Sequence, residues 1–113
     1  MMKYFLLFIA VAALFISSCK KGDVFVEDCS GAAKSFLTDV NPIVQTSCAT
    51  STGCHATGSS QGPGALTNYA QVFAAKSDIK KTVANGTMPQ NSSLTGAQKS
   101  AIICWINSGA PNN

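Results

Sequence analysis

Residues 95–111, TGAQKSAIICWINSGAP, contain the clearest secondary-structure signal in this 113-residue chain. Thr95 and Gln98 have the spacing of a capping box, in which each side chain accepts a backbone hydrogen bond at the start of a helix. The apolar residues that follow share one helical face: Ala101, Ile102, Trp105 and Ile106. Gly109 and Pro111 end the pattern, as glycine and proline commonly do. This stretch predicts a helix that buries its tryptophan.

An earlier stretch has the same periodicity. Four apolar residues fall at i, i+4, i+7 and i+8: Phe36, Val40, Ile43 and Val44. They predict a helix that runs toward Cys48. Its start is expected either near Thr38 or at Pro42, where Asn41 would be the N-cap and Pro42 the first helical residue.

A second helical region is expected from about residue 68 to residue 84. One side of it is formed by Tyr69, Val72, Phe73 and Lys76. Ser77 is a candidate cap for a separate short helix, which Asn85 and Gly86 would end. No stretch alternates as a strand would. We therefore expect an all-α fold of three to five short helices with long loops.

The first 18 residues have the pattern of an export signal. Lys3 gives a positive start, and residues 4–16 form an uninterrupted apolar run. A helix of this length reaches about 20 Å, whereas a bilayer core is about 30 Å thick, so the run is too short to span it comfortably. Ile16-Ser17-Ser18-Cys19 resembles the lipobox of bacterial lipoproteins. This resemblance implies that Cys19 is lipidated and begins the mature chain.

Residues 19–34 are expected to be a tether between the lipid on Cys19 and a single domain at residues 35–113. The lipid would anchor the protein to a membrane of the cell envelope, on the periplasmic or cell-surface side. From Cys19 onward the chain has seven lysines, five acidic residues and no arginine. This mild charge does not indicate a nucleic-acid partner. Domains this small often need a covalent staple, and four further cysteines are present: Cys29, Cys48, Cys54 and Cys104.

A polar, glycine-rich loop is expected over residues 49–64, and loops of this length usually have a function. Residues 48–55 read Cys-Ala-Thr-Ser-Thr-Gly-Cys-His. Two thiols followed directly by a histidine are typical of covalent haem attachment, in which the thiols add to the haem vinyl groups and the histidine binds iron. The usual signature has two residues between the cysteines. Here five residues separate Cys48 from Cys54, and they are small and include Gly53.

Met88 lies in the sequence Gly-Thr-Met-Pro, where Gly86 allows a turn and Pro89 stiffens it. A thioether is a soft ligand for haem iron, and ligation by histidine and methionine raises the reduction potential. Once the signal is removed, the chain has one histidine, His55, and one methionine, Met88. The histidine directly follows a cysteine, as in haem attachment sites, and the methionine lies in a turn that could present its sulfur to the iron.

Together these features resemble the small monohaem cytochrome c domains of exported bacterial proteins. The segments that match are Pro42-Ile43, Cys48, Gly53-Cys54-His55, Gly86-Thr87-Met88-Pro89, Trp105-Ile106 and Gly109-Ala110-Pro111. The resemblance covers about residues 36–111. It implies a cytochrome c-like fold around one haem c, with thioether bonds at Cys48 and Cys54 and with His55 and Met88 as axial iron ligands.

The resemblance also implies a function: a lipid-anchored c-type cytochrome that exchanges single electrons with redox protein partners in the cell envelope. No acid–base pair is visible, and His55 is assigned to iron, so we expect an electron carrier rather than an enzyme. With two cysteines assigned to haem, Cys29 and Cys104 are left over. We expect a disulfide between them.

Two alternatives remain open at this point. One is a haem-free, disulfide-stapled lipoprotein that acts as a binding or scaffold module, with Cys48 and Cys54 joined in a local disulfide. The other is a zinc site at Cys48, Cys54 and His55. A structural zinc site requires four ligands, and the adjacent Cys54 and His55 suit a tetrahedron poorly.

Overall fold

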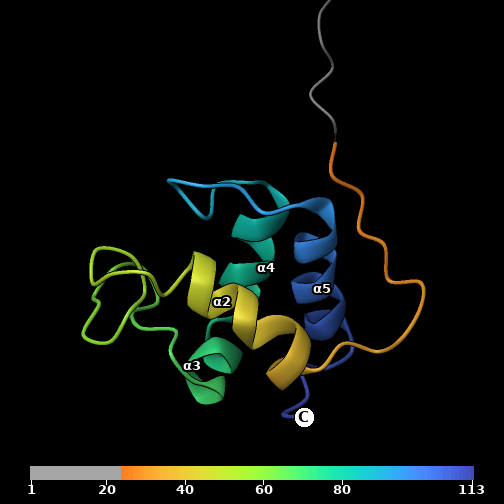
Figure 1. Cartoon of the computed structure of the whole chain (residues 1–113), viewed down its shortest axis with the longest axis horizontal. Coiled ribbons are helices and arrows are strands. Elements are labelled where there is room, and N and C mark those ends of the chain that lie inside the picture. Colours follow the sequence, from red (N-terminus) through yellow and green to blue (C-terminus); the bar gives the residue numbers. More distant parts are fainter. Residues whose placement is uncertain (1–23) are drawn as a thin grey trace, which may run out of the picture.

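The computed structural model describes residues 24–113, so the expected export signal and the lipidation site at Cys19 lie outside the described residues. Within 24–113 all regular secondary structure is helical, which confirms the expected all-α class (Figure 1). The elements are a π-helical segment η2 (Phe36–Val40), α2 (Asn41–Ser47), α3 (Tyr69–Ala74), α4 (Lys76–Ala84) and α5 (Gly96–Asn107). None of the helices in this part of the chain is long and apolar enough to cross a membrane.

The first helical region begins at Phe36, two residues before Thr38. Its α-helical part, α2, begins at Asn41, so Pro42 lies in the first turn as expected, but the N-cap is Val40 and not Asn41. Ser35 is the N-cap of η2, because its hydroxyl accepts the N–H of Thr38. The N–H of Ser35 donates in turn to the carboxylate of Asp39 at 2.8 Å. This local cap moves the start to Phe36, and η2 then continues into α2 without a break. The expected apolar face is buried at three of its four positions: Phe36, Val40 and Val44.

The second helical region divides into two helices as expected, but at a different residue. Asn68 caps α3 by accepting the N–H of Gln71 at 3.0 Å. Ala75 alone separates α3 from α4, so Ser77 lies in the first turn of α4 and is not its cap. Since Ala75 is buried, packing rather than a polar cap marks the break.

The capping box of α5 is formed as predicted. The N–H of Gln98 donates to the Thr95 hydroxyl at 3.2 Å, and the N–H of Thr95 donates to the Gln98 side chain at 2.9 Å. Burial of the helix is broader than the predicted face, because every residue from 100 to 105 is buried. The other helices therefore cannot be the only elements that cover α5.

The additional cover comes from residues 24–34, the described part of the expected tether, which run beside α5 without helix or strand (Figure 1). A disulfide joins Cys29 to Cys104 of α5, and their Cα atoms are 5.5 Å apart. These are the two cysteines that the sequence analysis left over. The N–H of Asp28 also donates to the Ser100 hydroxyl at 3.0 Å. Segment 24–34 is thus held to α5 by covalent and polar contacts.

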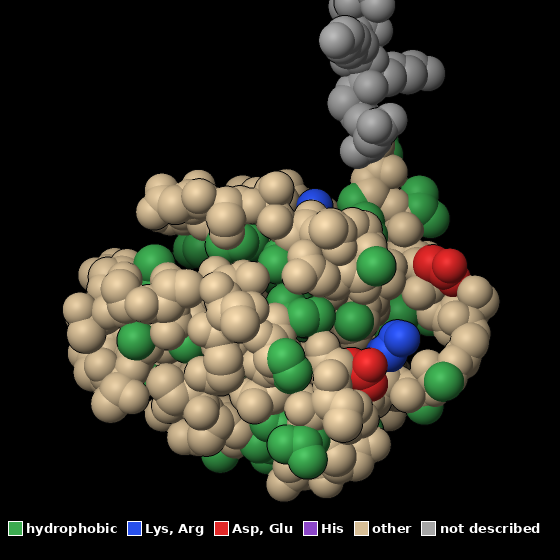
Figure 2. All heavy atoms as spheres, in the orientation of Figure 1, with side chains coloured by type: hydrophobic (Ala, Val, Ile, Leu, Met, Phe, Trp, Pro, Cys, Tyr) green, Lys and Arg blue, Asp and Glu red, His purple; other side chains and the backbone are tan. Residues whose placement is uncertain are grey.

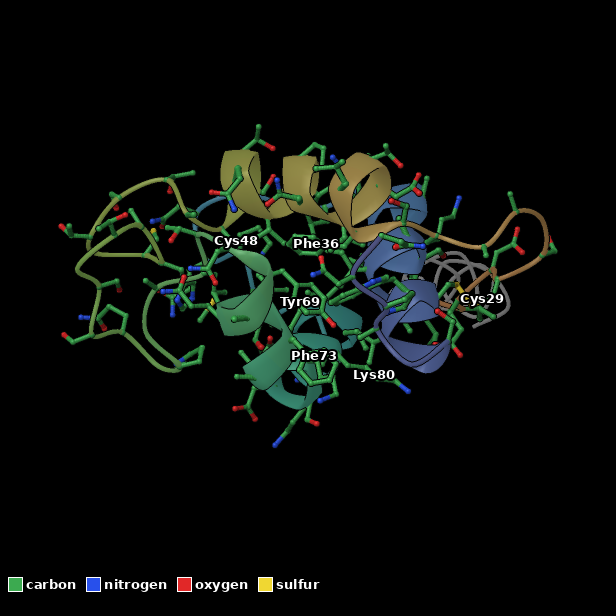
Figure 3. The ribbon with its side chains drawn as sticks, turned by 90° about the horizontal axis from the view of Figure 1, so that it is seen from below. Cys29, Phe36, Cys48, Tyr69, Phe73 and Lys80 are labelled. Carbon is green, nitrogen blue, oxygen red and sulfur yellow. A yellow bond between two sulfur atoms is a disulfide. The ribbon has the colours of Figure 1, made fainter. Side chains whose placement is uncertain are left out.

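Trp105 lies at the centre of the core and is fully buried, as its place on the predicted face indicated. Its ring centroid is 5.6 Å from that of Phe36 and 6.3 Å from that of Tyr69, so α5, η2 and α3 meet there (Figure 3). The indole N–H donates to the carbonyl of Pro111 at 2.9 Å. The Tyr69 hydroxyl donates to the carbonyl of Ala110 at 2.8 Å. The turn after α5 is therefore bound to the same aromatic cluster.

Asn113 fixes the start of the first helix from the other end of the domain. Its backbone carbonyl accepts the N–H of Leu37 at 2.8 Å and the Ser35 hydroxyl at 2.7 Å. Its side-chain oxygen accepts the N–H of Phe36 at 3.0 Å. These bonds satisfy N–H groups that the first turn of a helix leaves without partners.

Replacing both bonded cysteines, Cys29→Ser with Cys104→Ser, is expected to lower the free energy of unfolding by about 4 kcal/mol. The disulfide restricts the unfolded chain by closing a loop with a sequence separation of 75. Urea unfolding of the mature protein measures the loss. Reductant should destabilise the parent protein to the same level and leave the double variant unchanged. Equal unfolding midpoints for parent and variant would contradict the prediction.

Candidate functional site

A pocket lies between the end of α2, the loop at residues 48–66, α4 and the loop that follows α4. All four side chains that the resemblance assigned to haem line it: Cys48, Cys54, His55 and Met88. Cys48, Cys54 and His55 come from the loop at residues 48–66, and Met88 comes from the loop that follows α4. The fold therefore brings to one place donors that are far apart in the sequence.

The pocket is mostly apolar and open on one side. Its volume is about 250 Å³, and about 950 Å³ when the space out to open solvent is included. The apolar part of the lining comes from Pro63, Leu66, Ile79, Val83 and Pro89. Figure 2 shows hydrophobic side chains in the hollow between the two loops.

The first loop folds so that the wide cysteine spacing does not separate the donors. The N–H of His55 donates to the carbonyl of Cys48 at 3.1 Å, which closes the residues between them into a bulge. Inside the bulge the N–H of Cys54 donates to the carbonyl of Ser51 at 3.0 Å. Residues 51–53 are exposed, so the additional chain is placed in solvent. Cys48 consequently lies beside the Cys-His pair.

Cys48 and Cys54 are both free thiols and are not joined to each other. Burial raises the pKa of the Cys48 thiol, and the nearby Cys54 raises it further. Side-chain hydrogen bonds from Thr50 and Ser51 lower the pKa of the Cys54 thiol. The two thiols are therefore close together but unequal, since Cys54 ionises more readily.

His55 has a buried imidazole, with 8% of the residue exposed, and one hydrogen bond fixes its ring. Nδ1 lies 2.9 Å from the carbonyl oxygen of Gly64. A carbonyl only accepts, so in the neutral imidazole Nδ1 carries the proton and Nε2 keeps a lone pair. No buried side-chain nitrogen or oxygen within residues 24–113 lacks a partner, and nothing in that range bonds Nε2. Nε2 is therefore accessible from the pocket, as a metal ligand must be.

The sequence pattern did not indicate which residues hold this imidazole in place. Gly64 supplies the carbonyl and has a φ of +85°, which side chains with a Cβ rarely adopt. Gly62 has a φ of +52°, and a Cβ there would lie 3.9 Å from Cε1 of His55. The sequence did predict a polar, glycine-rich loop over residues 49–64. It gave no sign that Gly62 and Gly64 meet the histidine.

Met88 is half-buried in the loop after α4. Gly86, with a φ of +76°, turns the chain out of the helix. The N–H of Met88 donates to the carbonyl of Thr82 in α4 at 3.2 Å. This bond fixes the backbone of the loop against α4, and the thioether lines the same pocket as the imidazole.

A scan against protein-family models and searches of curated proteins and solved structures gave no significant match to this chain. Between residues 24 and 113, no group of three or more His, Cys, Asp or Glu residues is arranged to hold a metal ion. The zinc alternative therefore has no support in this part of the chain. The pocket is best described as a candidate cofactor site with sulfur and imidazole donors.

The imidazole of His55 is expected to carry its proton on Nδ1 in the haem-free mature protein. Ring ¹⁵N NMR at a pH where the imidazole is neutral measures the tautomer. Gly64→Ala should reduce this preference, because the left-handed backbone that presents the carbonyl is strained by about 1–2 kcal/mol when a Cβ is added.

Gly58→Ala is a matched control for this experiment. Gly58 has the same φ of +85°, but a Cβ there would meet nothing within 4 Å. Its backbone strain is therefore comparable, while the His55 tautomer should not change. A parent protein with the proton on Nε2 would show that the bond to Gly64 does not fix the ring.

Proposed function

We propose that the pocket binds one haem c through Cys48 and Cys54, and that the protein is a c-type cytochrome that transfers single electrons. The observation that carries this proposal is the convergence of the four donors on one pocket. The sequence pattern had named these donors, and Met88 belongs to a different loop from the other three. A cytochrome c-like arrangement of the helices is part of the same proposal.

The lining and the open side of the pocket fit a largely apolar group with one exposed edge. Cofactor pockets usually measure about 300–1,000 Å³. The pocket volume of about 250 Å³ is slightly below that range. The open side of the pocket would leave an edge of a bound group in solvent.

The donor set also fits haem. Two free thiols that lie close together suit addition across two vinyl groups, in which each sulfur bonds to carbon and each thiol proton passes to the neighbouring vinyl carbon. Haem supplies an iron that changes oxidation state by one electron. His55 would offer Nε2, held in place from behind by Gly64, and Met88 would offer its thioether. Such His/Met ligation is typical of electron carriers with a raised reduction potential.

The pocket and the N-terminal segment lie at opposite ends of the described domain. Cys48 and Cys29 are far apart in Figure 3, and segment 24–34 runs on the α5 side in Figure 1. We propose that a lipid on Cys19 holds the protein at a membrane of the cell envelope. The exposed edge of the haem would then remain free to meet redox protein partners there.

An absorption spectrum tests the haem proposal directly. The full chain is expressed in an export host that contains haem-attachment machinery, and the mature protein is purified. We expect a sharp c-type band in the reduced protein that survives denaturation. Cys48→Ala and Cys54→Ala should each remove one thioether bond, and the double variant should lose covalent haem.

The variant Cys29→Ser with Cys104→Ser is the control, because it removes two cysteines outside the pocket and should keep the haem. A colourless parent protein from a competent host would refute the cytochrome proposal. If that protein also has a Cys48–Cys54 disulfide, the haem-free lipoprotein becomes the preferred function.

Met88→Ala is expected to leave the haem attached and to lower the reduction potential, because a thioether ligand favours the reduced iron. A spectroelectrochemical titration measures the shift. Ser92→Ala is a suitable control, since Ser92 is exposed in the same loop and does not line the pocket. An unchanged potential in Met88→Ala would show that another group is the second ligand.

A further inference from the structure

The surface around the pocket has almost no charged side chains. Residues 40–75 contain no Asp, Glu, Lys or Arg, and neither do residues 82–98. These segments include α2, α3 and both loops that form the pocket. In Figure 2 the left part of the molecule, where these loops lie, shows neither red nor blue side chains. We call the exposed surface of the two loops, residues 48–66 and 85–95, the uncharged face.

The charges of the described chain lie elsewhere, on segment 24–34, η2, α4 and α5. They are Glu27, Asp28, Lys34, Asp39, Lys76, Asp78, Lys80, Lys81 and Lys99. Only Asp78 lines the pocket. Two of the α4 lysines contact neighbouring groups: Lys80 donates to the Asn107 side chain at 2.6 Å, and the Lys76 ammonium lies 3.8 Å from the centroid of the Phe73 ring.

Lys99 lies close to the base of the Met88 loop. Its ammonium lies 3.8 Å from the position that a Cβ on Gly86 would occupy. The same ammonium is 5.3 Å from the centroid of the Phe25 ring in segment 24–34. Lys99 therefore contacts the base of the loop from the α5 side. Asp78, which lines the pocket, carries the opposite charge to Lys99. The region therefore has no cluster of like charges.

This distribution limits the kind of partner that can dock at the exposed edge. A charged partner surface would lose hydration against the uncharged face without gaining an opposite charge, which is unfavourable. An uncharged polar or apolar surface avoids that penalty. The absence of complementary charges on the uncharged face therefore disfavours the binding of charged partner surfaces.

We propose that the uncharged face is the docking surface for a redox protein whose own contact surface is uncharged, and that their encounter is not steered electrostatically. The inference rests on the proposed cytochrome function. Steered encounters reach about 10⁸–10⁹ M⁻¹s⁻¹ at low salt, whereas neutral ones proceed at about 10⁵–10⁶ M⁻¹s⁻¹. The difference between these regimes is measurable through salt, because salt screens only charged encounters.

Small redox complexes of opposite charge test this proposal without knowledge of the partner. The reduced haem-loaded protein is mixed in a stopped-flow instrument with hexacyanoferrate(III), an anion, and with tris(phenanthroline)cobalt(III), a cation. We expect both rate constants to change less than about twofold between ionic strengths of about 0.01 M and about 0.5 M. A fall of about tenfold or more with either complex would overturn the proposal.

A pair of variants that add the same charge at different places makes the test specific. Gln90→Lys places a cation at the rim of the pocket, so oxidation by the anion should become several-fold faster at low salt and lose that gain at high salt. Ala32→Lys places a cation on segment 24–34 and should leave both rates unchanged. Equal behaviour of the two variants would show that electrons do not pass through the uncharged face.

NMR gives a readout that does not depend on electron transfer. Anionic and cationic paramagnetic chelates should relax the backbone amides of the uncharged face equally, and the anionic chelate should act more strongly near Lys80 and Lys81. Unequal relaxation across the face of a haem-loaded protein would overturn this inference alone. Absence of the haem band would overturn the proposed function, and the NMR comparison on that protein would still decide whether the face is neutral.

Discussion

The contacts of the Trp105 indole determine how the helices of this domain are arranged. The ring meets Phe36 and Tyr69, so η2, α3 and α5 converge on it. Its N–H would carry a large penalty if it were buried without a partner, and the carbonyl of Pro111 provides that partner. The turn after α5 is therefore as fixed as the helices. This core sets the direction of η2 and α2, and the C-cap of α2 is Cys48, which lines the pocket.

The pocket combines rigid and irregular elements in a way that suits a cofactor. Helices α2 and α4 supply fixed walls, while two loops supply the four donor side chains. Each loop is fixed by backbone hydrogen bonds next to a candidate ligand side chain, at His55 in the first loop and at Met88 in the second. The loops are therefore fixed next to these side chains, while each loop also has exposed stretches, such as residues 51–53 and 90–93.

The sequence predicted the features that arise from neighbouring residues. The capping box of α5 and the apolar face of the first helix depend on contacts within two turns, and both are present. The apolar face predicted from the sequence did not include Ser100 or Cys104, which are buried and are bonded to segment 24–34 from a distant part of the chain. It also missed the helix start at Phe36, which Asn113 stabilises from the other end of the domain.

For the candidate site, the four side chains that line one pocket could be singled out in advance, because few residue types suit the proposed chemistry. The support of the imidazole could not, because the acceptor is a backbone carbonyl, and every residue has one. The hydrogen bond from the N–H of His55 to the carbonyl of Cys48 likewise cannot be predicted from the composition of the loop. The distance along the chain between two thiols is thus a poor measure of their separation in space when the intervening residues fold outward.

The disulfide between segment 24–34 and α5 has a mechanical consequence. Tension applied through the N-terminal segment passes at Cys29 into Cys104, and from there into the most deeply buried helix of the domain. The loops at the far end, with their thiols, imidazole and thioether, lie outside that path. Tension on segment 24–34 therefore reaches the core of the described domain without passing through the loops of the pocket.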